Sequence, residues 1–235
     1  MSIDRGSSNW ARRWFGVAAS VLAAAGLLVA PAAFPGTAPG AAPAAHAEPC
    51  PDVEVIFARG RTESPGVGRV GNAFVSALRS KVDKNVNVYA VNYPADVEVD
   101  EGANDMSRRI QHMAATCPDT RLVIGGYSLG AAVTDVVLAA PISAFGFNSP
   151  LPPGMDQHIA AVALFGNGAP WIGGLLPLIN PAYGAKTVEK CHGADPVCVP
   201  ADPETWADNW GDHSAGQYIS SGMVNEAADF VASKL

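Results

Sequence analysis

The sequence predicts an α/β fold in which a parallel sheet of five strands is covered by helices on both faces. Short apolar runs bounded by glycine or proline alternate along the chain with segments whose apolar residues recur at helical spacing. A serine flanked by glycines also stands where one such run meets the helical segment that follows it. Alternation of this kind favours parallel strands buried between two layers of helices.

Five segments have the features of buried strands. The first is a short apolar run that stops at Gly60, and the second is rich in valine and tyrosine and stops at Pro94. The third runs into Gly125 and Gly126. The expected strands are 53–57, 86–93, 122–124, 159–165 and 186–190.

Four segments are expected to form helices. Apolar residues recur every three or four positions in three of them, and the other is rich in Ala, Val and Leu before it stops at Pro141. The second helix should end at Pro118, which cannot continue it. The expected helices cover 67–78, 106–117, 128–139 and 223–235. In sheets covered by helices in this way, ligand sites lie at the carboxyl ends of the strands.

The first 47 residues have the pattern of a signal peptide rather than of a folded domain. Arg12 and Arg13 precede a long Ala-rich apolar run, and Ala45-His46-Ala47 has the small-x-small pattern of a cleavage site. We therefore expect cleavage after Ala47 and a single domain over 48–235. The apolar run is also long enough to span a bilayer, so a retained anchor is the alternative.

The charge of the expected domain argues against polyanionic partners. Residues 48–235 contain 12 basic and 21 acidic residues, a net charge of −9. Nucleic acids and anionic membranes bind basic surfaces, so neither is expected here.

Four cysteines follow the leader, and an even number in an exported chain predicts two disulfides. Three pairings are possible. The favoured one joins Cys191 to Cys198, which closes a short loop, and leaves Cys50 to pair with Cys117. A zinc site that includes His192 is the disfavoured alternative, because no second pair of ligands accompanies it.

The most informative motif is G-x-S-x-G at Gly126 to Gly130, with Ser128 at its centre. The motif follows an expected strand and opens an expected helix, which is the context of a nucleophile elbow. The serine would sit on a strained turn, and the first N–H groups of the helix would face a developing oxyanion. The alternative is an ordinary strand-to-helix turn that carries a surface serine.

An activated serine needs a base, and His213 is the histidine best placed for that role. In this type of fold the acid and then the histidine follow the serine in the chain. His213 lies after the last expected strand, among small residues. The other histidines lie in the leader, before the serine, at the start of a strand or beside a cysteine; they are His46, His112, His158 and His192.

Asp195 is the expected carboxylate that orients the base. It follows the fifth expected strand and lies inside the loop that a Cys191–Cys198 disulfide would close, which would hold it firmly. Three other aspartates between it and His213 compete for this role, and Asp212 is disfavoured because it adjoins the histidine. The competitors are Asp202, Asp208 and Asp212.

With these residues in place, the chain resembles the cutinases, and within them the mycobacterial cutinase-like proteins. The resemblance extends from Cys50 to the C-terminus and is most specific around the cysteine-rich loop and the motifs at the ends of strands. The segments that carry it are Phe57-Ala58-Arg59-Gly60, Gly125 to Gly130, Leu164-Phe165-Gly166, Cys191 to Cys198 and Gly211 to Gly216.

The resemblance implies an α/β-hydrolase fold without a lid, and an oxyanion hole formed by the N–H groups of Leu129 and Arg61. Fungal cutinases have a glutamine in place of Leu129 and a hydroxyl residue in place of Arg61. Only the backbone N–H of Leu129 is needed, but Arg61 lacks the hydroxyl that helps to hold the oxyanion. Loss of one such donor typically costs about 10²–10³ in rate, although Thr62 is available to compensate.

An apolar segment over 171–179 suggests where the substrate binds. Trp171, Leu175 and Leu176 are the expected contacts with an acyl chain or a lipid surface, with core packing as the alternative. Trp206 and Trp210 are expected to line the opposite side of the substrate site.

A G-x-G-x-x-G match at 66–71 does not predict nucleotide binding, because the next strand ends without the acidic residue that would bind a ribose.

Together these features predict an exported or cell-wall-associated serine esterase whose mechanism needs no cofactor or metal. The resemblance implies esters of short to medium acyl chains, including lipids, as substrates. We also expect transient contact with lipid surfaces and a monomeric protein. A weakly catalytic protein that binds lipid or envelope components is the alternative, motivated by Arg61. A peptidase is a third possibility, but nothing in the sequence resembles a pocket for a peptide side chain.

Overall fold

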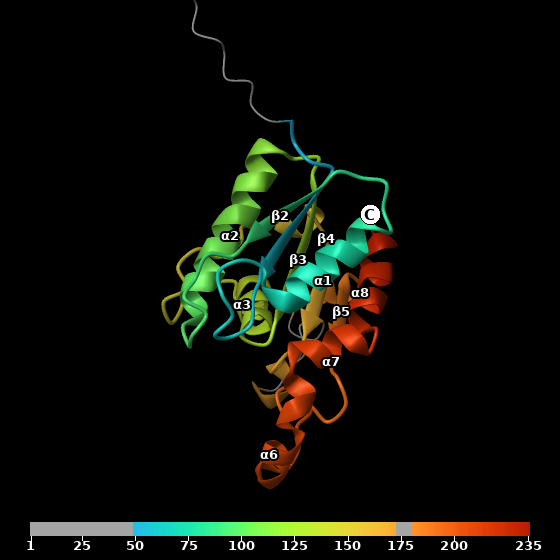
Figure 1. Cartoon of the computed structure of the whole chain (residues 1–235). Coiled ribbons are helices and arrows are strands. Elements are labelled where there is room, and N and C mark those ends of the chain that lie inside the picture. The colour runs from blue at the N-terminus through green and yellow to red at the C-terminus, as the bar shows by residue number, and fades with distance from the viewer. Residues whose placement is uncertain (1–48, 173–179) are drawn as a thin grey trace, which may run out of the picture. The chain divides into compact units, whose positions relative to one another are not determined.

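The computed structural model describes residues 49–172 and 180–235 (Figure 1). The expected signal peptide and two of the expected substrate contacts, Leu175 and Leu176, lie outside the described residues. None of the described helices is long and apolar enough to cross a membrane.

The five expected strands form one parallel sheet in the order β2-β1-β3-β4-β5. The strands are β1 (Val53–Ala58), β2 (Val86–Ala90), β3 (Arg121–Tyr127), β4 (Ile159–Phe165) and β5 (Thr187–Lys190). β2 ends three residues before the predicted end. The N–H of Val91 still donates to the Phe57 oxygen of β1, but Asn92 donates its N–H to the side chain of Asp105 instead.

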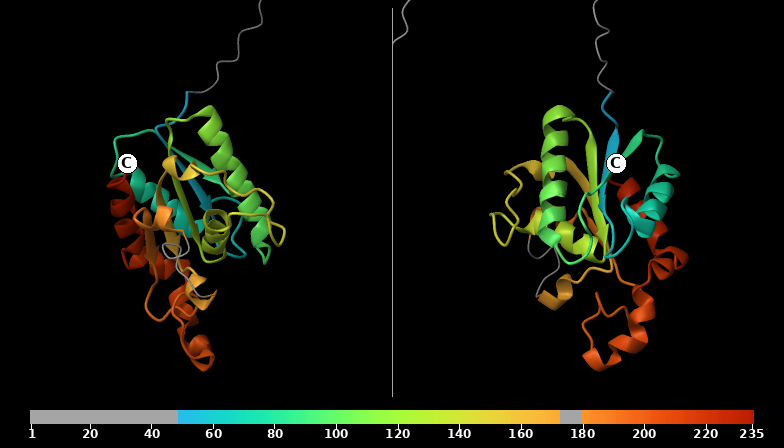
Figure 2. Two further views of the ribbon diagram at one scale, coloured as in Figure 1. Left: turned by 180° about the vertical axis from the view of Figure 1, so that it is seen from behind. Right: turned by 60° about the vertical axis from the view of Figure 1, so that its left-hand side comes forward.

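Helices cover both faces of the sheet, as predicted for this class. On one face lie α2 (Val99–Thr116) and α3 (Leu129–Ala139). On the other lie α1 (Gly68–Arg79), α7 (Ala215–Ser220) and α8 (Met223–Ala232). The right-hand view of Figure 2 shows α2 and α1 on opposite sides of the strands. The chain therefore has the three-layer architecture of an α/β-hydrolase fold.

Several short helices were not predicted, because four to six residues are too few to show a helical period. They are α5 (Pro181–Gly184), α6 (Trp206–Asn209) and α7, with single 3₁₀ turns at Met155–Gln157, Ala169–Ile172, Pro203–Thr205 and Trp210–His213.

Each face of the sheet has its own hydrophobic core, because successive side chains of a strand point to opposite faces. In β1, Ile56 packs with α2 and α3 while Phe57 packs with α1 and the C-terminal helices.

Glu54 is the one charged residue of β1. Its fully buried carboxylate accepts two hydrogen bonds from Arg109, at 2.7 and 2.6 Å, and one from Asn87.

The four cysteines form the two favoured disulfides, Cys50–Cys117 and Cys191–Cys198. The first ties the segment before β1 to the end of α2, and the second closes the loop that follows β5. In the chain-entropy account each typically contributes about 2–4 kcal/mol by constraining the unfolded chain.

Candidate active site

Ser128 lies on a sharp turn between β3 and α3. Its backbone has a φ of 55° and a ψ of −118°, a strained conformation for a residue with a Cβ. The flanking glycines allow the turn: a Cβ on Gly126 would lie 2.0 Å from the Gly130 carbonyl oxygen, and one on Gly130 would lie 2.0 Å from the Ala58 oxygen. The motif thus has the geometry of a nucleophile elbow.

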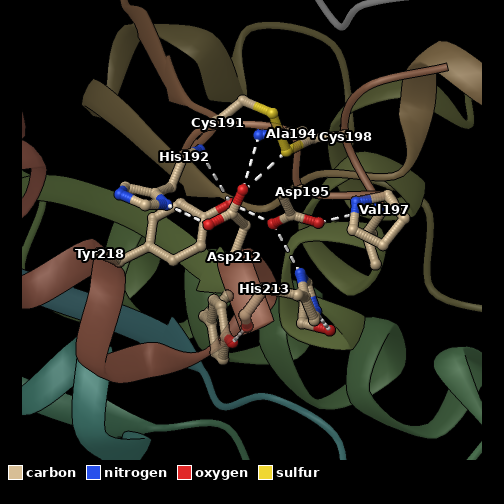
Figure 3. Close-up of polar contacts among 12 residues, drawn as sticks. Cys191, His192, Ala194, Asp195, Val197, Cys198, Asp212, His213 and Tyr218 are labelled. Carbon is tan, nitrogen blue, oxygen red and sulfur yellow. Dashed lines mark hydrogen bonds and ion pairs between the residues drawn. A yellow bond between two sulfur atoms is a disulfide. The ribbon is translucent and has the colours of Figure 1, made fainter. Parts of the chain in front are cut away.

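Ser128, His213 and Asp195 meet at the carboxyl edge of the sheet, although they come from three distant segments. Nε2 of His213 lies 2.8 Å from Oγ of Ser128, and Nδ1 lies 2.7 Å from Oδ2 of Asp195. Figure 3 shows the imidazole pointing from the Trp210–His213 turn toward Asp195 in the disulfide loop. The arrangement allows a proton to pass from the hydroxyl to the ring while the carboxylate holds the ring in place.

Asp195 is completely buried yet remains acidic. Burial by itself raises the pKa of this carboxyl, but hydrogen bonds from His213, Tyr218 and the N–H of Val197 outweigh burial, so its pKa lies below the usual range. Tyr218 donates to Oδ2, and the Val197 N–H donates to Oδ1 at 2.8 Å. The Cys191–Cys198 disulfide closes the loop that contains Asp195 and so restrains its backbone, while the hydrogen bonds restrain its carboxylate.

Aromatic rings hold the imidazole of His213. The Tyr127 ring is stacked on it with centroids 5.4 Å apart, and the Tyr127 hydroxyl donates to the His213 carbonyl oxygen. The Trp210 ring packs beside it, also at 5.4 Å. Gly166 leaves room for the ring: its φ is +58°, and a Cβ there would lie 3.0 Å from Cε1 of His213.

The competing aspartates do not reach the imidazole. Asp212 instead accepts the N–H of Ala194 at 2.8 Å and lies 3.5 Å from Nδ1 of His192. Asp202 accepts a hydrogen bond from the Glu204 N–H at the start of a 3₁₀ turn, and Asp208 is exposed. His158 lies at the opposite end of the sheet, before β4, and Nδ1 of its ring approaches the Pro118 oxygen.

Ser128 opens into a cavity of about 570 Å³ that both expected oxyanion donors line. Arg61, Leu129, Ala132, Val197 and Trp210 are among the residues around it. Within the described residues, the N–H groups of Arg61 and Leu129 donate to no other protein group. Both remain available to a bound oxygen.

A network around Glu63 holds the loop that carries Arg61. The Glu63 carboxylate accepts the N–H of Gly60 at 2.7 Å and that of Arg69, in the first turn of α1, at 2.8 Å. The buried Arg59 side chain donates to the carbonyl oxygens of Glu63 and Tyr93. These contacts tie the loop to α1 on one side and to the segment after β2 on the other.

Among the described residues, the tryptophans divide between two positions. Trp210 lines the cavity, whereas Trp171 packs edge-on against Trp206 at 5.2 Å and donates its indole N–H to the Pro196 oxygen. Trp171 is not among the residues that line the Ser128 cavity. No group of three or more histidine, cysteine or acidic side chains in the described parts of the chain could hold a metal ion.

Three residues at the site were assigned no role from the sequence: Tyr127, Tyr218 and Glu63. Tyr127 lies inside the G-x-S-x-G motif, and Tyr218 follows His213 by five positions in α7. Nothing in the local sequence of the two tyrosines indicates which group each would contact, since the hydroxyl of each binds a distant segment.

Comparison with known proteins agrees with this geometry. The family model described as Cutinase matches residues 49–235. A Mycobacterium tuberculosis protein described as probable carboxylesterase Culp2 is 67% identical over 223 residues, which cover 94% of each chain. Phospholipase Culp4 of the same organism is 48% identical, and the match covers 97% of this chain and 96% of that protein.

Two solved structures share the fold. Trichoderma reesei cutinase in complex with a phosphonate inhibitor has a TM-score of 0.55 and 29% identity, over 78% of this chain and 76% of that one. The catalytic core domain of acetyl xylan esterase from Trichoderma reesei has a TM-score of 0.63 and 25% identity, over 80% and 100% of the two chains.

Proposed function

This chain belongs to the cutinase family, and from that premise we propose that it is a serine esterase that cleaves carboxylic esters of short to medium acyl chains through an acyl-enzyme on Ser128. The observation that carries the proposal is the continuous hydrogen-bonded series from Ser128 through His213 to Asp195. Relatives described as carboxylesterases and a phospholipase support ester hydrolysis as the reaction class.

In the proposed reaction, Oγ of Ser128 attacks the ester carbonyl as its proton passes to Nε2 of His213. The negative charge moves to the carbonyl oxygen, where the N–H groups of Leu129 and Arg61 stabilise it. Collapse of this intermediate expels the alkoxide, which takes the proton from His213. Water then attacks the acyl-enzyme by the same route, releases the acid and restores the Ser128 hydroxyl.

Asp195 supports this cycle by remaining ionised. Its pKa lies below the usual range, so it is a carboxylate at neutral pH and can hold the Nδ1–H of His213 in the tautomer the reaction needs. It also stabilises the imidazolium that forms as the serine proton arrives.

Arg61 is the residue that bears on the rate. It supplies a backbone N–H at the cavity but no side-chain hydroxyl, so the oxyanion would have fewer donors than in fungal cutinases. One donor is typically worth about 10²–10³ in rate, so a modest turnover is expected.

We further propose that the protein is exported after cleavage of residues 1–47, acts as a monomer without a cofactor, and meets its ester or lipid substrate outside the cytoplasm. The two disulfides support export, because such bonds persist in oxidising compartments.

A series of p-nitrophenyl esters with purified wild-type, Ser128→Ala and Ser64→Ala proteins tests the proposal. Ser64 is an exposed serine that follows Glu63 in the loop that carries Arg61, and it serves as the matched control. Ester turnover should vanish in Ser128→Ala and persist in Ser64→Ala, and a fluorophosphonate probe should label only proteins that retain Ser128. Unchanged turnover in Ser128→Ala would reject the mechanism, and a folded wild-type protein that neither reacts nor labels would favour a binding role.

A further inference from the structure

A second cavity, of about 480 Å³, lies further along α3 from Ser128. It is bounded by the start of α2, the second half of α3 and the turn at 144–147, and we call it the distal groove. Its apolar lining residues include Val97, Val99, Val136, Ala140, Phe145 and Phe147.

One face of α3 joins the Ser128 cavity to the distal groove. Leu129 and Ala132 line the cavity, and Val136 and Ala140 line the groove. Their spacing of three, four and four residues places all four on the same side of the helix. All four are partly exposed and apolar, so this face forms a hydrocarbon track that begins beside the nucleophile.

The outer wall of the groove is held in place rather than loosely attached. Ala144 and Phe147 exchange two backbone hydrogen bonds of 2.9 Å, which makes a tight turn with Phe145 at its tip. Asn104 of α2 binds this segment twice, since its side chain donates to the Gly146 oxygen and accepts the N–H of Asn148. The wall is therefore preorganised, which lowers the entropic cost of binding.

The wall is nevertheless strongly apolar toward solvent. Phe145 at the tip of this wall is fully exposed at 103%. Val97, on the α2 side of the groove, is exposed at 61%, and Ile142, which precedes the turn, is exposed at 69%. In Figure 1 the segment that follows α3 lies beside the first turns of α2. Large apolar side chains that are exposed beside a preorganised groove indicate an occupant.

We propose that the distal groove receives the far end of a long acyl chain whose ester carbonyl is at Ser128, with the chain lying along the α3 track. This rests on the proposed function and extends it to longer acyl chains. Continuity with the Ser128 cavity selects an acyl chain of the substrate as the occupant. The charged lining residues, Glu98 and Asp100, are both acidic, which disfavours an anionic headgroup or an anionic surface.

The geometry sets a chain length at which the groove begins to matter. Ser128 to Val136 spans about 12 Å and Ser128 to Ala140 about 18 Å at 1.5 Å per helical residue. An extended chain advances about 1.2 Å per bond, as in a fully extended peptide, so Val136 is reached after about ten bonds. Hexanoate should stop within the Ser128 cavity, whereas dodecanoate and tetradecanoate should enter the groove.

The test measures kcat/KM for p-nitrophenyl hexanoate, dodecanoate and tetradecanoate, each below its micelle concentration, in wild type and three variants. Val136→Trp fills the groove, and Val97→Asp places a charge on its exposed opposite wall, where a change of side chain does not disturb the core. Ala139→Trp is the matched control, because Ala139 lies on the same helix but lines a different cavity.

The quantity that decides is the ratio of kcat/KM for tetradecanoate to that for hexanoate, because a general loss of folded enzyme cancels from it. The ratio should fall about tenfold in Val136→Trp and Val97→Asp, the scale on which an apolar pocket discriminates a chain that no longer fits, and stay within about twofold in Ala139→Trp. An unchanged ratio in both groove variants would reject the proposal that the acyl chain follows α3 into the distal groove. A wild-type protein that hydrolyses no ester would instead reject the proposed function.

Discussion

Asp195, which is buried, and Asp135, which is half-buried, both lie beside the segment that follows β4, yet they differ in acidity. The tyrosine and histidine that bind Asp195 lie against Gly166, and Asp135 lies beside the next residue, Asn167. Asp195 has a pKa below its usual range, whereas burial raises the pKa of Asp135 to about 7.

The difference comes from hydrogen-bond donors rather than from burial. Asp195 accepts bonds from an imidazole, a phenol and a backbone N–H. Oδ1 of Asp135 has no partner among the described residues, and the nearby Glu189 carboxylate raises its pKa further while the Asn167 amide lowers it only in part. Burial always disfavours the charged form, so the number of donors decides whether a buried carboxyl stays ionised.

The largest expected effect comes from removing the charge of Asp195. Asp195→Asn should lower kcat for ester hydrolysis by about 10⁴, because an amide no longer holds His213 in the required tautomer. Asp208→Asn, at an exposed aspartate in the same stretch of chain, should leave kcat within about twofold, as is usual for changes on the surface. Comparable activity in the two variants would mean that the Asp195 carboxylate has no role in the reaction.

Asp135→Asn should stabilise the protein more at alkaline than at acidic pH. With a pKa of about 7 in the folded protein and an ordinary one in the unfolded chain, the folded state binds more protons between these values, so stability falls as pH rises toward 7. The gain in unfolding free energy should be about 3 kcal/mol larger at pH 8 than at pH 5, measured by urea denaturation.

The exposed Asp83 provides the control for this experiment, because Asp83→Asn should shift stability equally at the two pH values. A stabilisation by Asp135→Asn that does not depend on pH would show that Asp135 is ionised in the folded protein throughout this range.

The smallest of the three effects comes from removing one donor from Asp195. Tyr218→Phe should cost about 2 kcal/mol of unfolding free energy at pH 7, because a hydrogen bond to a charged acceptor is lost. The lowered pKa of Asp195 contributes stability that is present above its unfolded pKa and is lost as the pH falls through the lower folded value. The deficit of Tyr218→Phe should therefore shrink as the pH falls below the unfolded pKa of Asp195, about 3.9.

Tyr183→Phe is a matched control, since Tyr183 is also buried but its hydroxyl donates no hydrogen bond among the described residues. A deficit of the same size in both variants, or one that stays constant with pH, would assign the effect of Tyr218 to packing alone.

The strands, the longer helices and the serine turn were predictable because they depend on local physics. Short apolar runs that stop at glycine or proline identified all five strands, and the limits of 159–165 matched β4 at both ends. The two glycines around Ser128 were informative because a Cβ at either position would collide with backbone, which any chain of this fold has to avoid. The short helix α7 was missed because six residues show no period.

The sequence by itself determined the layered fold, the cysteine pairs that local spacing favours, and Ser128 with a short set of partners. Only the tertiary structure decided which of four aspartates faces the imidazole and that Tyr218 and Val197 keep this aspartate ionised. It also decided that one face of α3 lines both the Ser128 cavity and an apolar groove. The physical reason is range: backbone propensity and periodicity act over a few residues, whereas a hydrogen bond between positions 128 and 213 exists only once the sheet has assembled.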